Sequence, residues 1–594
     1  MKFQFYSLVF LLLLPAFGVA QNLRTIKYAT ADTGNLATIA EPLHFEQLVM
    51  VDSFIYAMGS LDPKLTDFDI NPQSQSLYSS GFITKYDGYF AKYDQDMNLI
   101  WKKIHKTSRI ANNGIEVTGY NSVIYHPYDQ SFYGICGAVG VVDINPSNET
   151  TIVNNPPPLF FPNQNNSGLS FAKLDTSAQV LWHKEFNIAN VDSTFRTDIK
   201  LLPQKNGNVY LLGELAGHGN LVIDSGVSYP KTQAQFRNLP YIANYSPNGN
   251  LIWYRVFTGT YWSGIYTTAT VDFNDNLIMA GIFIDTINID TGSGMITKIA
   301  DDSTGSGARY SNCILKYDTS GQLQYFKTIK AYSYIDITNC ITDDANNLYL
   351  GCTLRGTVNI STDSSQQYLV SAVNQAGNPI NSVMMCAKYD SLGNLSWGKV
   401  IGTSDVSFGK VFGFSKNNDV MMAGGTFINL QQRCLSYAIV DLDKTTGNEV
   451  SRISLDTSAS NFVQLPNKNL LGYGYIGPPA CRIEFDFSPN SFVSVPQKSL
   501  VFVALYGSFG VSTHAPLVGG TSIYPTPATH ELVVERSAAR PPALATLYDL
   551  WGRVVLATTL TQPCSQLGVG ELPSGFYVLR IAGEGRSYKV VVQH

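Results

Sequence analysis

The chain has 594 residues and a formal net charge of −5, with 14% charged residues, 12% aromatic residues and 49 glycines. The length exceeds one ordinary compact domain, and the composition is typical of a turn-rich β protein rather than a helical or disordered one. The slightly acidic balance excludes the basic surface of a nucleic-acid-binding protein, so no nucleic-acid partner is expected.

The first twenty residues predict a signal peptide. Lys2 precedes an apolar run that ends at Leu14, and the small residues Gly18 and Ala20 precede Gln21 at the positions that a signal peptidase requires. The run is too short for a good membrane span; the alternative is a buried first strand. No other stretch of 18 apolar residues follows. We therefore expect no transmembrane span in the mature chain.

One short pattern returns five times: an alternating strand that ends in Ala-Lys-Tyr-Asp or a variant, a tight turn, and a second strand with an aromatic residue. Its copies begin at Phe90, Phe171, Ile242, Ile314 and Cys386. The Asp before each turn predicts a carboxylate that accepts backbone N–H bonds. The aromatic position predicts packing between repeats; stacking on a sugar is the functional alternative. The aromatic residues are Trp101, Trp182, Trp253, Tyr325 and Trp397.

A second, glycine-ended strand alternates with this pattern and has seven copies, from Ile55–Gly59 to Leu470–Gly474. Together the two patterns indicate four antiparallel strands in each unit of about 70 residues, which favours an all-β, seven-bladed β-propeller over an open β-solenoid. The last unit lacks a clear fourth strand. We expect the orphan strand Thr25–Ala29 to complete it, because ring closure removes unpaired strand edges.

The connections from the glycine-ended strand to the next strand are long and emerge on one face of such a propeller. Because loops often carry function, this face is a candidate binding face, and decoration of a scaffold is an equally weighted interpretation. The connections run over roughly 141–169, 216–240, 284–311 and 356–383.

Motifs for chemistry are scarce. We identify no catalytic motif, no cofactor-binding loop and no set of metal-ligand spacings, so no catalytic, cofactor-binding or metal residue is predicted. Cys340 and Cys352 lie on adjacent strands of one predicted hairpin and are weak disulfide candidates; buried free thiols are the other interpretation. A propeller can still assemble a site from several blades.

Two segments carry a resemblance for the repeats, Gly281–Asp290 and Leu315–Gly321. Over about 40–510 the chain resembles the β-propeller repeats of exported Bacteroidetes-type proteins. The resemblance implies the fold and implies no activity.

The repeats stop after Gly507, and residues 511–520 form a predicted linker. Alternating strands between Gly and Pro turns then predict a small Ig-like β-sandwich over 521–594. Its motifs resemble the type A C-terminal sorting domain of the type IX secretion system, although Thr526 departs from the usual Asn. The resemblance implies export across the outer membrane, with the type IX machinery as partner; an appended Ig-like binding domain is the alternative. The matching residues are Tyr524, Pro525, Pro527, Gly552, Gly575 and Lys589.

The sequence thus predicts a signal peptide over 1–20, a propeller over 21–510 that the N-terminal strand closes, a linker, and a sorting domain. We expect a secreted or outer-membrane-surface protein that passes through the periplasm and binds an unidentified glycan or protein without catalysis. The alternatives are a polysaccharide hydrolase or lyase with its site on the long-loop face and a structural module of a surface assembly.

Overall fold

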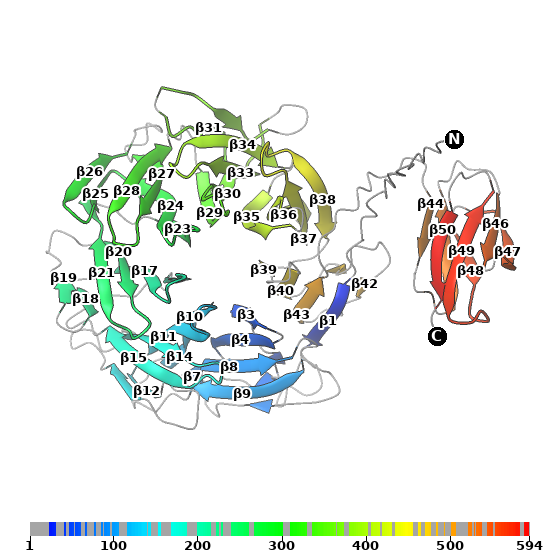
Figure 1. The fold of residues 1–594 in the computed structure, drawn as a ribbon, viewed down its shortest axis with the longest axis horizontal. Helices are drawn as coiled ribbons and strands as arrows, with labels where there is room; N and C mark the ends of the chain where they lie inside the picture. Colours follow the sequence, from blue (N-terminus) through cyan, green and yellow to red (C-terminus); the bar gives the residue numbers. More distant parts are fainter. Residues whose placement is uncertain are drawn as a thin grey trace, which may run out of the picture. The chain divides into compact units, whose positions relative to one another are not determined.

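In the computed structural model (Figure 1), every described element of regular secondary structure is a β-strand. The described residues form two compact units, one within Val19–Val511 and one within Ser512–His594. The residues that the structure describes are 23–30, 41–42, 47–52, 54–60, 66–67, 77–78, 85–86, 88–94, 98–105, 116–138, 140–143, 152–155, 168–186, 199–215, 221–224, 227–229, 239–260, 266–300, 309–329, 335–363, 365–373, 379–401, 406–415, 418–429, 434–455, 461–464, 470–476, 483–484, 492–493, 500–506, 521–524, 528, 530–536, 543–549, 553–562, 564–582 and 587–592.

The first unit is a seven-bladed β-propeller. Seven antiparallel sheets follow one another around a ring (Figure 1), and in each we name the strands A to D from the inside outward. Blade 1 consists of β3 (Gln47–Val51), β4 (Phe54–Ser60), β8 (Gly88–Tyr93) and β9 (Leu99–His105). Blade 2 consists of β10 (Glu116–His126), β11 (Ser131–Ala138), β14 (Gly168–Leu174) and β15 (Val180–Phe186). A two-residue strand, β7 (Lys85–Tyr86), adds to β10 in parallel.

The next four blades keep the same order. Blade 3 consists of β16 (Lys200–Pro203), β17 (Val209–Leu215), β20 (Leu239–Tyr245) and β21 (Leu251–Val256). Blade 4 consists of β23 (Tyr266–Val271), β24 (Leu277–Ile284), β27 (Tyr310–Tyr317) and β28 (Leu323–Ile329). Blade 5 consists of β29 (Ile335–Thr342), β30 (Leu348–Leu354), β33 (Val383–Tyr389) and β34 (Leu395–Ile401). Blade 6 consists of β35 (Val406–Phe414), β36 (Val420–Asn429), β37 (Cys434–Leu442) and β38 (Glu449–Leu455).

Blade 7 joins the two ends of the propeller. Its strands are β39 (Asn461–Gln464), β40 (Leu470–Ile476) and β43 (Leu500–Tyr506), and its outermost strand is β1 (Leu23–Thr30). β1 pairs antiparallel with β43, from Leu23 opposite Tyr506 to Thr30 opposite Leu500. The N-terminal strand that the sequence left unpaired therefore closes the ring, and the last sheet is complete without a covalent C–D turn.

The position of a strand within its blade explains its sequence. A strand in the middle of a blade is covered on both faces by neighbouring blades, so it reads as a continuous apolar run. All seven residues of β30 are buried, whereas in β28, at the outer edge, only Ile329 is buried and the other six residues are partly or fully exposed. The core is therefore made between blades. One cluster joins Tyr210 and Trp253 of blade 3 to Leu315 and Tyr317 of blade 4.

Small sheets decorate the ring. Five hairpins or short sheets arise from B–C connections. Figure 1 shows β12, β18, β19, β25, β26 and β31 toward the outside of the propeller. They are β12 (Gly140–Asp143) with β13 (Ile152–Asn155), β18 (Leu221–Asp224) with β19 (Val227–Tyr229), β25 (Thr286–Asp290) with β26 (Met295–Ile299) and β22 (Thr258–Thr260), β31 (Thr357–Asn359) with β32 (Leu369–Ser371), and β41 (Ile483–Glu484) with β42 (Phe492–Val493). Blade 1 carries β2 (Glu41–Pro42), β5 (Thr66–Asp67) and β6 (Leu77–Tyr78).

The second unit is a small β-sandwich. Its two sheets share one apolar core that includes Leu532, Leu547, Leu579 and Val590, as expected where strands alternate inward and outward residues. One sheet has the order β44 (Thr521–Tyr524), β45 (Glu531–Arg536), β48 (Cys564–Gly568). The other has the order β47 (Val554–Leu560), β46 (Ala543–Tyr548), β49 (Gly575–Ile581), β50 (Ser587–Val592).

Candidate functional site: the tight-turn face of the propeller

The repeated Asp residues stabilise the C–D turns. Asp318 Oδ1 accepts the backbone N–H groups of Ser320 (3.0 Å) and Gln322 (2.9 Å). Asp390 does the same for Leu392 and Asn394. A carboxylate that accepts two backbone donors stabilises a tight turn and has its oxygens occupied. These acids therefore serve the fold, as the pattern indicates.

The repeated aromatic residues join each blade to the next. Trp253 is 8% exposed, and its Nε1–H donates to the carbonyl oxygen of Thr319 in the next C–D turn at 2.9 Å. A Cβ at Gly321 would lie 2.7 Å from Cδ2 of the Trp253 ring, so glycine is needed there both for its φ of +80° and for the close approach of the ring.

The same contact recurs around the ring. Trp182 donates to Pro247 O at 3.0 Å and Trp397 donates to Lys444 O at 3.3 Å, each across a blade boundary. The ring of Tyr325 lies against Gly393, but its hydroxyl has no hydrogen-bond partner among the described residues. Trp101 is half-buried and packs against a cluster that joins blade 1 to Phe132 and Leu174 of blade 2. The repeated aromatic side chains therefore pack between blades.

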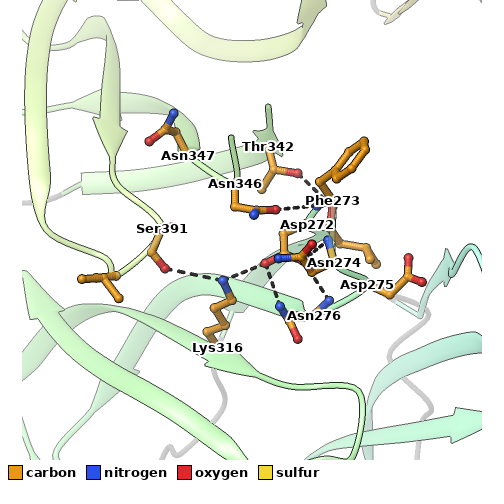
Figure 2. A network of polar contacts seen from close by, with 12 residues as sticks. Asp272, Phe273, Asn274, Asp275, Asn276, Lys316, Thr342, Asn346, Asn347 and Ser391 are labelled. Atoms are coloured by element: carbon orange, nitrogen blue, oxygen red, sulfur yellow. Dashed lines mark hydrogen bonds and ion pairs between the residues drawn. The ribbon is translucent and has the colours of Figure 1, made fainter. Parts of the chain in front are cut away.

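A ladder of lysines, which the sequence patterns do not reveal as functional, reinforces these boundaries. Lys316 Nζ lies 2.7 Å from Oδ2 of Asp272 in the A–B turn of its own blade and donates to Ser391 O of the next blade at 3.4 Å (Figure 2). Lys173 pairs in the same way with Asp129 at 2.9 Å and with Pro247 O. The signal for this ladder in the sequence was the lysine that recurs in the Ala-Lys-Tyr-Asp pattern.

Blade 3 replaces this ion pair with a neutral one. Gln204 Nε2 donates to Asn244 Oδ1 at 2.8 Å, and both residues are buried. The substitution preserves a hydrogen bond across the blade while removing both charges. Gln204 Oε1 and Asn244 Nδ2 have no hydrogen-bond partner among the described residues. Replacement of both members at once avoids a single buried charge without its counter-ion, which would be costly.

The A–B turns are tied to each other as well. Asn346 Oδ1 accepts the backbone N–H of Phe273 at 2.8 Å (Figure 2). Asp275 Oδ1 accepts the N–H of Lys205 at 3.0 Å. These bonds join the turns of blades 3, 4 and 5 into one network. Because successive strands run in opposite directions, the A–B and C–D turns all lie on one face, which we call the tight-turn face.

Exposed aromatic side chains stand on this face. Tyr128, in the A–B turn of blade 2, is 57% exposed, and Phe273, in the A–B turn of blade 4, is 56% exposed. Lys205, in the intervening turn, places its Nζ 3.2 Å from the centroid of the Phe273 ring, and the same Nζ donates to the carbonyl oxygen of Phe273. We call Tyr128, Lys205 and Phe273 the turn rim. The turn polar groups described above are committed to internal bonds, so the turn rim offers apolar faces beside a cation, which suits binding.

The long-loop insertions use their acids structurally. Lys184 Nζ donates to Asp224 Oδ1 at 2.6 Å, and Arg255 Nε lies 3.8 Å from Asp290 Oδ1. Tyr317 donates its hydroxyl to the carbonyl oxygen of Asp290. These contacts fasten the small hairpins to the propeller, which supports their interpretation as scaffold decoration.

Cys340 and Cys352 are buried free thiols, so this interpretation is confirmed and the weak disulfide candidate is wrong. Cys340 lies opposite Leu350 and Cys352 opposite Ile337 in the register of blade 5, and both cysteines are free and buried. Burial raises the pKa of the Cys340 thiol to about 11, so it stays protonated and behaves as a small apolar residue. Among the residues that the structure describes, no group of three or more His, Cys, Asp or Glu is arranged to hold a metal ion.

The sorting-domain residues fall partly within the described chain. Tyr524 lies on β44 opposite Val533, Gly575 opens β49 opposite Val592, and Lys589 lies on β50 opposite Val578. Pro525, Pro527 and Gly552 lie outside the described residues.

Comparison with known proteins supports the C-terminal assignment. Residues 522–593 match the family described as "Secretion system C-terminal sorting domain". A type IX sorting domain indicates that the protein is exported to the cell surface or secreted. In the part of the chain that the structure describes, no helix is long and apolar enough to cross a membrane.

The chain shows weak similarity to several solved structures. One, from Dyadobacter fermentans and of unknown function, has 12% identity and a TM-score of 0.31, with 65% of this chain and 93% of that chain covered. PorZ from Porphyromonas gingivalis, a surface component of the type IX secretion system, has 9% identity and a TM-score of 0.18, with 93% and 86% covered. A PL25 ulvan lyase has 10% identity and a TM-score of 0.31, with 77% and 92% covered. No curated protein matches the chain.

Proposed function

We propose that the protein is a non-catalytic binding or adhesion propeller that the type IX secretion machinery delivers to the cell surface or the medium. The turn rim is the observation that carries the proposal. It presents two exposed aromatic rings and one cation on a face where the carboxylate of Asp272 is bonded to backbone N–H groups. Such a surface offers contact area for a ligand.

The division of the chain follows from this role. Residues 1–20 are removed as a signal peptide, 21–510 form the binding propeller, 511–520 act as a linker, and 521–594 address the protein to the secretion machinery. The sorting-domain match over 522–593 supports the last assignment. The pairing of β1 with β43 supports a propeller that begins close to residue 21.

The turn rim suits a glycan or a protein segment with an apolar face. A sugar ring presents a C–H face that packs flat on Tyr128 or Phe273, and Lys205 attracts an acidic substituent. Aromatic side chains supply such contact area at a small cost in conformational entropy. The ring of Phe273 is held by its turn, since its backbone N–H is bonded to Asn346.

A glycan array probed with the mature chain tests the proposal. The Tyr128→Ala/Phe273→Ala variant should lose at least tenfold in affinity for any glycan bound. Ile252→Ala is the matched control, because Ile252 is an exposed apolar residue on an outer strand and its loss should leave binding unchanged. Equal binding by all three proteins would overturn the turn rim as the site. Cleavage of a bound polysaccharide during incubation would assign a hydrolase or lyase instead.

A further inference from the structure

The turn rim lies on three consecutive A–B turns that are bonded to one another. His126 Nε2 lies 3.2 Å from the carbonyl oxygen of Asn208, which joins the turn of blade 2 to that of blade 3. The backbone N–H of Lys205 donates to Asp275 Oδ1 at 3.0 Å, which joins the turn of blade 3 to that of blade 4. The rim is therefore a fixed surface, and little conformational freedom is lost when a ligand binds it.

Contacts with the turn of blade 4 hold Lys205 in place. Its backbone N–H is bonded to Asp275, and its Nζ donates to the carbonyl oxygen of Phe273. The same Nζ lies 3.2 Å from the centroid of the Phe273 ring, and the residue is exposed. Because a lysine ammonium group has three N–H donors, the bond to the Phe273 carbonyl leaves donors for a ligand.

Lys205 has no counter-ion, unlike the lysines of the neighbouring blades. Lys173 Nζ lies 2.9 Å from a carboxylate oxygen of Asp129, and Lys316 Nζ lies 2.7 Å from one of Asp272. Among the described residues, no carboxylate forms an ion pair with Lys205. Its positive charge is therefore free to meet a negative charge on a ligand.

The exchange of residues in blade 3 accounts for this unpaired charge. The A–B turn Gln204–Asn208 contains no acid, because Gln204 stands where blade 4 has Asp272. Asn244 stands where blade 4 has its buried lysine, and the two amides bond to each other at 2.8 Å. Blade 3 thus has no charge at the buried pair and a cation at the exposed tip of its turn.

The cation and the rings together favour an anionic sugar as ligand. The ammonium group of Lys205 already occupies the position over Phe273 that a ligand cation would take. A charge-assisted bond from an ammonium group to a carboxylate or sulfate oxygen is stronger than its bond to a neutral hydroxyl group. The rings of Tyr128 and Phe273 are 57% and 56% exposed, and they offer apolar area to the C–H face of a sugar ring.

We propose that the turn rim binds an acidic glycan, whose carboxylate or sulfate group accepts hydrogen bonds from Lys205 Nζ while a sugar ring packs on Phe273 or Tyr128. The inference rests on the binding function proposed above and narrows its ligand class. Carboxylate and sulfate groups present the same acceptor chemistry to a lysine, so the experiment includes both. Asp275 is a partly exposed acid in the turn of Phe273, and its negative charge opposes such a ligand.

An array of acidic glycans, each beside its neutral counterpart, tests the inference with the mature chain. Alginate represents the uronates and dextran sulfate the sulfate esters, beside carboxyl-reduced alginate and dextran. We expect the bound glycans to be acidic, and each to bind about tenfold more tightly than its neutral counterpart, as the difference between a charged and a neutral hydrogen bond implies. This preference should shrink as the salt concentration rises. Equal binding of acidic and neutral forms, or binding of no acidic glycan, would overturn the inference.

Variants assign the preference to one side chain. Lys205→Gln should abolish it, and Lys205→Arg, which keeps the charge, should retain it. Lys298→Gln is the matched control, because Lys298 Nζ lies over the Phe326 ring at 5.8 Å outside the turn rim; acidic glycans should bind this variant as they bind the parent. Asp275→Asn keeps an oxygen acceptor for the backbone of Lys205 and removes a negative charge, so it should strengthen the binding of acidic glycans.

The results separate the ligand class from the binding function itself. Neutral glycans that bind the parent and Lys205→Gln equally, but fail to bind Tyr128→Ala/Phe273→Ala, would overturn the acidic ligand and leave the turn rim as the site. Acidic glycans whose binding none of these changes affects would place the ligand elsewhere and overturn both. A loss of binding in Lys298→Gln equal to that in Lys205→Gln would show attraction to the overall charge and overturn the role of Lys205.

Discussion

The ring of Trp253 covers Gly321 of the next blade so closely that a Cβ at Gly321 would lie 2.7 Å from it. The indole also donates to Thr319 in the same turn. One side chain thus supplies apolar burial and a hydrogen bond at a blade boundary. The propeller has no single central core, so its stability depends on repeating such boundaries.

Trp253→Ala should lower the free energy of unfolding by about 3–5 kcal/mol, because it leaves a cavity between blades 3 and 4. Denaturant titration of the mature chain measures this loss. Ile252→Ala, which removes an exposed neighbour, is the control and should cost less than about 0.5 kcal/mol. A loss below about 1 kcal/mol for Trp253→Ala would mean that the indole does not stabilise the boundary.

The Lys316–Asp272 pair allows a test of paired replacement. Lys316→Met should cost about 3–5 kcal/mol, because it leaves the buried Asp272 carboxylate without its cation. The double change Asp272→Gln/Lys316→Asn copies the Gln204–Asn244 pair of blade 3 and should cost less than the single change. Urea unfolding of the three proteins gives the comparison. A double variant less stable than Lys316→Met would show that the two pairs are not interchangeable.

The buried carboxyl of Asp441 predicts a pH dependence of the free energy of unfolding. Its folded-state pKa of about 6 lies above the ordinary value of about 3.9, so the folded state holds the proton more tightly. Stability is therefore fully present below about pH 4 and is lost as pH rises through 6, by at most about 3 kcal/mol. Unfolding free energies of the mature chain across this range measure it.

A matched variant decides that prediction. The Asp441→Asn chain should lack this decline, because an amide does not titrate. The same slope in both chains would mean that other groups cause it.

Deletion of 521–594 should leave the propeller folded and trap it in the periplasm, because the residues matched to the sorting family are then gone. Fractionation and surface labelling of the host cells locate the protein. Limited proteolysis compared with the full chain shows whether the propeller is intact. Normal surface display of the truncated, folded protein would contradict the role of the tail.

The sequence by itself determined the features that depend on local periodicity. Alternating strands, Asn/Asp/Gly turns and the seven glycine-ended copies predicted the seven blades, and the unpaired strand at Thr25–Ala29 predicted the closure that β1 makes with β43. The turn carboxylates were predictable for the same reason, because Asp318 and its backbone donors lie within four residues of each other. The tail motifs predicted the sorting domain.

Only the tertiary structure decided which distant residues meet. Lys316 and Ser391 are 75 residues apart, and Trp253 and Thr319 are 66 apart, so their contact depends on how one blade lies on the next. Cys340 and Cys352 lie on the two strands of one hairpin, but the register of these strands pairs each cysteine with another residue. The same geometry placed the exposed aromatic rings of Tyr128 and Phe273 on the tight-turn face. A repeat specifies each blade by local patterns, but side chains between blades are placed by packing, which no local pattern contains.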